Sequence, residues 1–176
     1  MTNPTRSRAR WTITVLVALA EVAHLVWEHL HGGVASHHLL NRADLPAISN
    51  AWGALFLPTL AWILSGPVLR RATTARAAKD IATAFFGSLL VGVALSVAFL
   101  NGFEDVSSGI FLGILLAGLV LRVYRGEYVL GFVLGMTFTF GAMLPTAAAA
   151  FVAIVSAIAH HLLRPALRWL WVRARA

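Results

Sequence analysis

The sequence predicts an all-α integral membrane protein, a polytopic bundle of about six transmembrane helices with both termini on the cytoplasmic side. Of its 176 residues, 59% are hydrophobic and only 12% are charged, against about 25% in a typical soluble domain. The mean hydropathy is +0.80. The chain lacks the polar surface that would cover a soluble globule, so lipid is its expected solvent. We expect one membrane domain over residues 1–176.

Six apolar segments approach the length of about 20 residues that a membrane-spanning helix needs. In chain order they are residues 11–30, 52–69, 81–100, 108–124, 128–144 and 146–163. The last two segments are separated by Pro145, which favours a helix end just before it. The alternative is a five-helix protein, in which one long kinked helix replaces these two segments.

The basic residues favour six helices. If the N-terminus is inside, every Lys and Arg except Arg42 falls in a cytoplasmic segment, as the positive-inside rule requires. A five-helix protein would place the arginine-rich tail, residues 164–176, outside. The tail alternates Arg with Leu and Trp, which is typical of a segment that lies along a membrane surface. We therefore predict a multi-pass protein of the plasma (inner) membrane.

The remaining composition excludes several classes of protein. The net charge of +7 does not indicate nucleic-acid binding, because the cations flank apolar segments and form no separate stripe. The absence of cysteine excludes disulfides, thiolate metal ligands and thiol nucleophiles. The start of the chain resembles a signal peptide, but its apolar run continues to Trp27, which favours an uncleaved helix.

Two consecutive segments contain the same small-residue motif, G-x-x-L-G. It comprises Gly109 and Gly113 in the fourth segment, and Gly131 and Gly135 in the fifth. Glycines four residues apart allow two helix backbones to approach closely. We expect the fourth and fifth helices to pack on each other, or on a second copy of the chain in a homo-oligomer.

The first segment contains ionisable residues that are unusual in a membrane span. Glu21, His24, Glu28 and His31 fall within an arc of about 80° on one helical face. Each ionisable group in a spanning helix costs about 2.5–3.5 kcal/mol on insertion scales and is a functional candidate by default. Neighbours in this row are three or four residues apart, so their side chains can meet.

A metal site is one interpretation of this row. Imidazole and carboxylate groups without thiolate suit a divalent transition metal such as Zn, Fe, Mn, Co or Ni. His24 and Glu28, at i and i+4, can hold one ion, and residues of the outer loops can complete its coordination. The predicted metal ligands are His24, Glu28, His31, His37, His38, Glu104 and Asp105.

The same row also fits a proton relay or a structural role. Glu21 and His24 can form a relay, since both can take up and release a proton. Alternatively, they can hold helices together without any further function. Asp80 and Glu127 are each expected to begin a helix as a favourable N-terminal charge.

These features predict a small transporter or channel-like protein, for a divalent transition metal or coupled to protons. One alternative is a membrane-embedded, metal-dependent hydrolase that acts on a lipid at the outer interface, with Glu28 or Asp105 as the base. Another is an accessory membrane subunit. The chain has no P-loop, no G-x-S-x-G and no H-E-x-x-H motif, so no catalytic residue is assigned.

Overall fold

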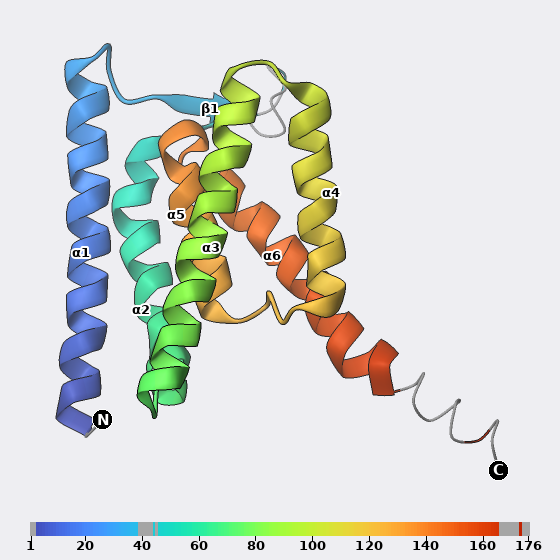
Figure 1. The fold of residues 1–176 in the computed structure, drawn as a ribbon. Coiled ribbons are helices and arrows are strands. Elements are labelled where there is room, and N and C mark those ends of the chain that lie inside the picture. The colour runs from blue at the N-terminus through green and yellow to red at the C-terminus, as the bar shows by residue number, and fades with distance from the viewer. Residues whose placement is uncertain (1–2, 39–43, 45, 166–172, 174–176) are drawn as a thin grey trace.

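The computed structural model describes residues 3–38, 44, 46–165 and 173. Within them the chain forms six α-helices that run alternately up and down a bundle (Figure 1). The helices are α1 (Asn3–Leu30), α2 (Gly53–Arg71), α3 (Ala75–Leu100), α4 (Glu104–Val120), α5 (Gly126–Phe140) and α6 (Met143–Ile158), and α6 continues into the π-helical turn η3 (Ala159–Leu163). The predicted all-α helix bundle is confirmed.

Four helical segments are long and apolar enough to cross a membrane. They are Pro4–Leu30, Asn50–Arg71, Ala75–Leu100 and Met143–Leu163, whereas α5 is apolar but shorter. Large apolar side chains such as Leu16, Leu19 and Leu90 are exposed on the outer faces of the helices. Such side chains are expected to face lipid, because a soluble protein rarely exposes extended apolar patches. The chain is therefore a membrane protein by composition and by the distribution of its apolar side chains.

The two ends of the bundle differ in charge. Figure 1 shows the start of α1, the end of α6 and the α2–α3 and α4–α5 connections at one end. We call this the basic end; its described cations are Arg6, Arg8, Arg10, Arg70, Arg71, Arg76, Lys79, Arg122, Arg125 and Arg164. Arg42 and most of the tail 164–176, including Arg168 and Arg175, lie outside the described residues.

The opposite end is closed by a short hairpin that the sequence did not predict. Strand β1 (Ser36–His38) pairs antiparallel with β2 (Ala47–Ser49), with His37 opposite Ile48. The 3-10 turn η2 (Asn50–Trp52) then leads into α2. We call this the hairpin end.

The last two predicted segments are separate helices, but Gly141 separates them and Pro145 does not. Gly141 has φ 66°, a left-handed conformation that a residue with a Cβ rarely adopts. Pro145 lies in the first turn of α6, where its missing N–H costs no intrahelical hydrogen bond. Proline is therefore compatible with the start of this helix, and the break comes four residues earlier than expected.

The two glycine motifs have different surroundings. A Cβ on Gly131 or Gly135 would collide with backbone carbonyl oxygens of α3, at Phe85 and Leu89 respectively. A Cβ on Gly109 or Gly113 would meet no atom within 4 Å. The motif in α5 therefore packs on α3, so the expected packing of the fourth and fifth helices on each other is wrong. The motif in α4 meets no other part of the described chain, and its packing on a second copy stays a prediction.

Helix α5 lies at the centre of the bundle. It contacts α2, α3 and α6, and its Val133 side chain is fully buried. Leu57 and Ala61 of α2 and Val17 of α1 belong to the same buried apolar cluster. The interface between α1, α2 and α5 is thus closely packed around the polar row of the first helix.

Candidate functional site

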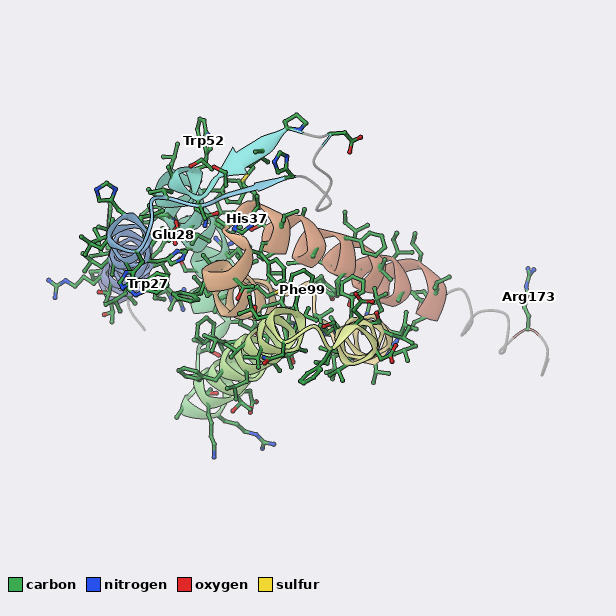
Figure 2. All side chains as sticks on the ribbon, turned by 90° about the horizontal axis from the view of Figure 1, so that it is seen from above. Trp27, Glu28, His37, Trp52, Phe99 and Arg173 are labelled. Atoms are coloured by element: carbon green, nitrogen blue, oxygen red, sulfur yellow. The ribbon has the colours of Figure 1, made fainter. Side chains whose placement is uncertain are left out.

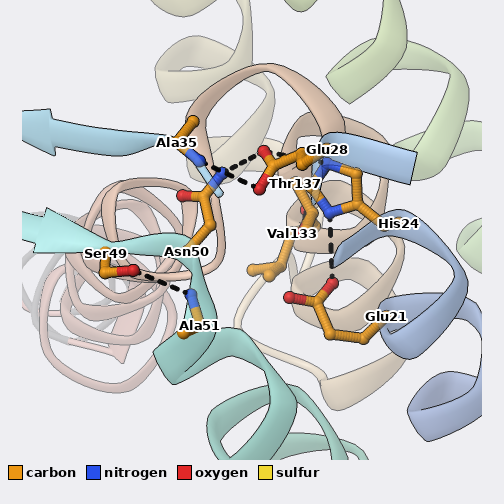
Figure 3. Close-up of polar contacts among 9 residues, drawn as sticks. All are labelled: Glu21, His24, Glu28, Ala35, Ser49, Asn50, Ala51, Val133 and Thr137. Atoms are coloured by element: carbon orange, nitrogen blue, oxygen red, sulfur yellow. Dashed lines mark hydrogen bonds and ion pairs between the residues drawn. The ribbon is translucent and has the colours of Figure 1, made fainter. Parts of the chain in front are cut away.

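Three ionisable side chains of α1 form a continuous buried row (Figure 3). The side chains of Glu21, His24 and Glu28 are 2%, 8% and 7% exposed. His24 Nδ1 lies 3.5 Å from Glu21 Oε2, and His24 Nε2 lies 3.4 Å from Glu28 Oε1. The spacing of three and four residues along α1 produces this arrangement. One imidazole therefore lies between two carboxylates, away from the surface.

Helices α2 and α5 enclose the row. At the start of α2, a Cβ on Gly53 would collide with Glu21 Oε1, so the carboxylate lies directly against the backbone of Gly53. From α5, the Phe138 ring lies 5.1 Å from the His24 ring, between centroids. Glu21 Oε1 is buried and has no hydrogen-bond partner, although buried polar atoms are usually paired. This carboxylate oxygen is thus free to bind a proton or a cation.

The hairpin end closes the row through Glu28. After α1, Gly32 and Gly33 adopt φ values of 127° and 105° and turn the chain back over the helix. The backbone N–H of Ala35 then donates to Glu28 Oε2 at 3.2 Å. Asn50 Nδ2 donates to Glu28 Oε1 at 2.5 Å. Both oxygens of this carboxylate are therefore held by donors from outside α1.

Asn50 is a site residue that was not among the predicted ligands. It is 4% exposed, it binds Glu28, and its Oδ1 lies where a Cβ on Gly141 would be. It therefore connects α1, the hairpin and the α5–α6 turn. Asn50 follows Glu28 by 22 residues, with the hairpin between them. No local pattern indicates this contact, which depends on the pairing of β1 with β2.

Three predicted ligands lie near the row but outside it. His31 Nδ1 is 2.7 Å from the carbonyl oxygen of Trp27, and the His31 ring stacks on the Trp27 ring at 4.5 Å. His31 shares the predicted arc, but α1 ends at Leu30 and the side chain stays exposed. His37 lines a small cavity beside Asn50, and His38 is exposed in β1.

Glu104 and Asp105 are not brought to the row. Both are exposed in the first turn of α4. Helices α1 and α4 lie on opposite flanks of the bundle in both views (Figures 1 and 2). Among the described residues, no group of three or more His, Asp and Glu side chains is arranged to hold a metal ion. Of the predicted metal ligands, His24 and Glu28 contact each other.

A second buried charge lies at the basic end. The Glu127 side chain, 3% exposed, accepts two hydrogen bonds from Arg71, one of them from Nη1 to Oε1 at 2.9 Å and the other from Nη2 to Oε2. Glu127 was expected only to begin a helix. Because Arg71 ends α2 and Glu127 begins α5, the pair also joins these two helices.

The row stops at Glu21 in this conformation. The next side chain of the same face toward the basic end is Val17, which is 7% exposed and belongs to the apolar core. The following polar group is Thr14, whose hydroxyl is buried without a partner. Seven residues of helix separate Thr14 from Glu21, about 10 Å. The polar groups therefore extend from the hairpin end to Glu21 and not through the whole bundle.

Comparisons with known proteins add no candidate function. No protein family, curated protein or solved structure matches the chain.

Proposed function

We propose that the protein is a small proton-coupled transporter, in which Glu21, His24 and Glu28 bind the proton. The observation that supports this function is the buried row itself, with an imidazole 3.5 and 3.4 Å from two carboxylates. Imidazole is the side chain whose charge changes most readily near neutral pH. Ionisable groups within a membrane span are costly and characterise ion and proton pathways.

The charge of the row indicates what it binds. With His24 protonated and both carboxylates ionised, the three side chains carry one positive and two negative charges, a net charge of −1. A second proton or a cationic substrate would neutralise this charge, and neutral groups are far less costly to bury. The unpaired Oε1 of Glu21 is the acceptor for that proton or cation. Competition between a proton and a cation at one site is the basis of exchange.

The direction of access follows from the positive-inside rule, which assigns the basic end to the cytoplasm. The row then lies toward the outer side of the plasma (inner) membrane, where Glu28 and Asn50 close it beneath the hairpin. Val17 closes it on the inner side. Access from one side at a time is what a coupled carrier requires, whereas a channel needs a continuous path. The geometry therefore favours a carrier over a channel.

Proton binding can be tested by infrared spectroscopy of the full-length protein in liposomes. As the external pH is lowered, the wild type is expected to gain a protonated-carboxyl band, which Glu21→Gln or Glu28→Gln removes. The matched control is His29→Ala, on the same turn of α1 but exposed, which should leave the band unchanged. If the band persists in both glutamine variants, the row does not bind the proton.

Proton movement needs a second measurement, with a pH-sensitive dye inside the liposomes. Under an inside-negative diffusion potential, His24→Ala is expected to slow proton entry, because it removes the imidazole that lies between the two carboxylates, and His29→Ala should not. Equal rates for wild type and His24→Ala would contradict the relay. A variant that keeps its rate but loses stability would indicate the structural alternative, an accessory subunit.

A divalent transition metal is the second candidate for the cation. It is favoured by the two ring nitrogens of His24, which are buried without a hydrogen-bond partner. The measurement is the metal content of the purified protein, wild type beside His24→Ala/Glu28→Ala, by elemental mass spectrometry. Near-stoichiometric Zn, Fe, Mn, Co or Ni that the double variant loses would favour metal transport. No metal after incubation with each ion would leave the proton as the bound species.

A further inference from the structure

A cavity of about 470 Å³ lies between α3, α4, α5 and α6, separate from the polar row. Its volume is within the range of about 300–1,000 Å³ that is typical of small-molecule sites. Apolar residues from all four helices line it, including Val91, Ile114, Phe132 and Val152. Figure 1 shows α3 and α4 close together at the hairpin end and further apart toward the basic end. The lining is therefore mostly apolar, as an acyl chain requires.

The charged lining residue and most of the polar ones are on the side of the basic end, whereas Ser88 lies in the middle of α3. Asp80 and Thr83 belong to the first turns of α3, and Tyr128 belongs to the first turn of α5. The apolar lining residue Val91 lies further along α3, toward the hairpin end. The cavity is therefore amphipathic along its length, which suits a ligand with a polar head and an apolar chain.

Three cations lie close in the chain to residues that line the cavity at the basic end, although none of them lines it. Lys79 precedes the lining residue Asp80, and Arg76 is one helical turn earlier. On the opposite wall, Arg122 lies between the lining residues Leu121 and Val123. Arg76, Lys79 and Arg122 are exposed, and within the described part of the chain none of them forms an ion pair. Three cations against one carboxylate favour an anionic head group.

We propose that this cavity binds an anionic phospholipid, with an acyl chain among the apolar residues and the phosphate beside Lys79 and Arg122. Basic pockets between membrane helices on the cytoplasmic side bind anionic lipid head groups by this combination of charge and apolar contact. The lipid would fill the space between α3 and α4 and connect their ends at the membrane surface. This inference does not depend on proton coupling by the row in α1.

The apolar part of the site can be blocked without disturbing its wall. A Cβ on Gly87, which lines the cavity, would meet no atom within 4 Å, so Gly87→Leu fills the cavity itself. The control is Gly109→Leu, since Gly109 is equally open but does not line the cavity. Native mass spectrometry of the detergent-purified full chain would be titrated with phosphatidylglycerol and phosphatidylcholine of identical acyl chains. Gly87→Leu should weaken binding of both lipids by roughly tenfold, and Gly109→Leu should not.

The charged part is tested with Lys79→Gln/Arg122→Gln, two exposed positions where folding is not at risk. The wild type should prefer phosphatidylglycerol over phosphatidylcholine. A basic residue near an anionic lipid surface is worth about fivefold in affinity, so the double variant should lose roughly 25-fold of this preference. Its affinity for phosphatidylcholine should stay unchanged.

Three results would overturn the proposal. Wild-type affinity of Gly87→Leu for phosphatidylglycerol would show that the lipid binds elsewhere. Equal affinity of the wild type for the two lipids would exclude selection by charge. Binding of tetraphenylphosphonium that Asp80→Asn abolishes, together with no preference for phosphatidylglycerol, would identify a lipophilic cation as the occupant.

Discussion

Replacement of Gly135 by alanine is expected to separate α5 from α3. The added Cβ would collide with the carbonyl oxygen of Leu89 and lie 3.0 Å from the backbone nitrogen of Val93. Both atoms belong to the backbone of α3, so no rotamer change can relieve the contact. The two helices must therefore move apart. Gly92 of α3 belongs to the same close contact, because a Cβ there would lie 2.6 Å from the carbonyl oxygen of Phe132.

The size of the effect follows from two opposing terms. Overpacking of a close contact costs about 1–3 kcal/mol, and contact with a rigid backbone places this case near the upper value. The gain in helix propensity from glycine to alanine is at most about 1 kcal/mol. We therefore expect Gly135→Ala to lower the free energy of unfolding by about 2 kcal/mol.

The matched control is Gly113→Ala, because Gly113 occupies the same position in the same G-x-x-L-G motif. A Cβ there would meet no atom within 4 Å, so only the gain in helix propensity remains and the free energy of unfolding should stay unchanged or rise by up to about 1 kcal/mol. Both variants would be unfolded reversibly in mixed micelles with increasing sodium dodecyl sulfate and followed by circular dichroism. Equal stability of the two variants would refute the described contact between α3 and α5.

Three further predictions use the same unfolding measurement. Asn50→Ala should cost about 2 kcal/mol, because Glu28 Oε1 loses a buried donor at 2.5 Å and hydrogen bonds to charged groups contribute about 1.5–3 kcal/mol; a neutral effect would mean that water replaces Asn50. Arg71→Leu should lower the free energy of unfolding by about 3 kcal/mol, because it leaves Glu127 buried and unpaired. The double variant Arg71→Leu/Glu127→Leu should recover most of this loss. If it does not, the loss does not come from the unpaired Glu127. Ser156→Ala removes a hydrogen bond of 2.7 Å to a carbonyl oxygen near the end of α4 and should cost about 1 kcal/mol, and an unchanged midpoint would show that the bond contributes nothing.

The helices could be predicted from the sequence because hydropathy is a local property. Their limits were less accurate, since polar residues extend α1 and α3 beyond the apolar spans. Helix α3 begins at Ala75, where Thr74 Oγ1 accepts a hydrogen bond from the backbone N–H of Ala77, six residues before the predicted start. Proline is a clear local signal, so the sequence predicts the break between α5 and α6 at Pro145. The actual break at Gly141 is beside Asn50, from a distant part of the chain.

The same distinction applies to the candidate site. The contacts of His24 with Glu21 and Glu28 could be predicted, because residues three and four apart meet on any α-helix. The partner of Glu28 at the outer end of the row could not be predicted, since Asn50 reaches Glu28 only after the hairpin has formed. Nor could the ion pair of Arg71 with Glu127, which are separated by 56 residues.

The sequence by itself determined the membrane environment, the helical class, the charge asymmetry and the polar row of the first helix, because each follows from composition or from the geometry of a single helix. Only the tertiary structure decided which of the two identical glycine motifs packs closely. Gly131 and Gly135 pack on α3, whereas Gly109 and Gly113 contact no neighbouring helix. The tertiary structure also decided which charges are buried together and where the cavity lies. The physical reason is that packing, ion pairs and cavities depend on contacts between distant segments, and a local pattern does not specify its partner.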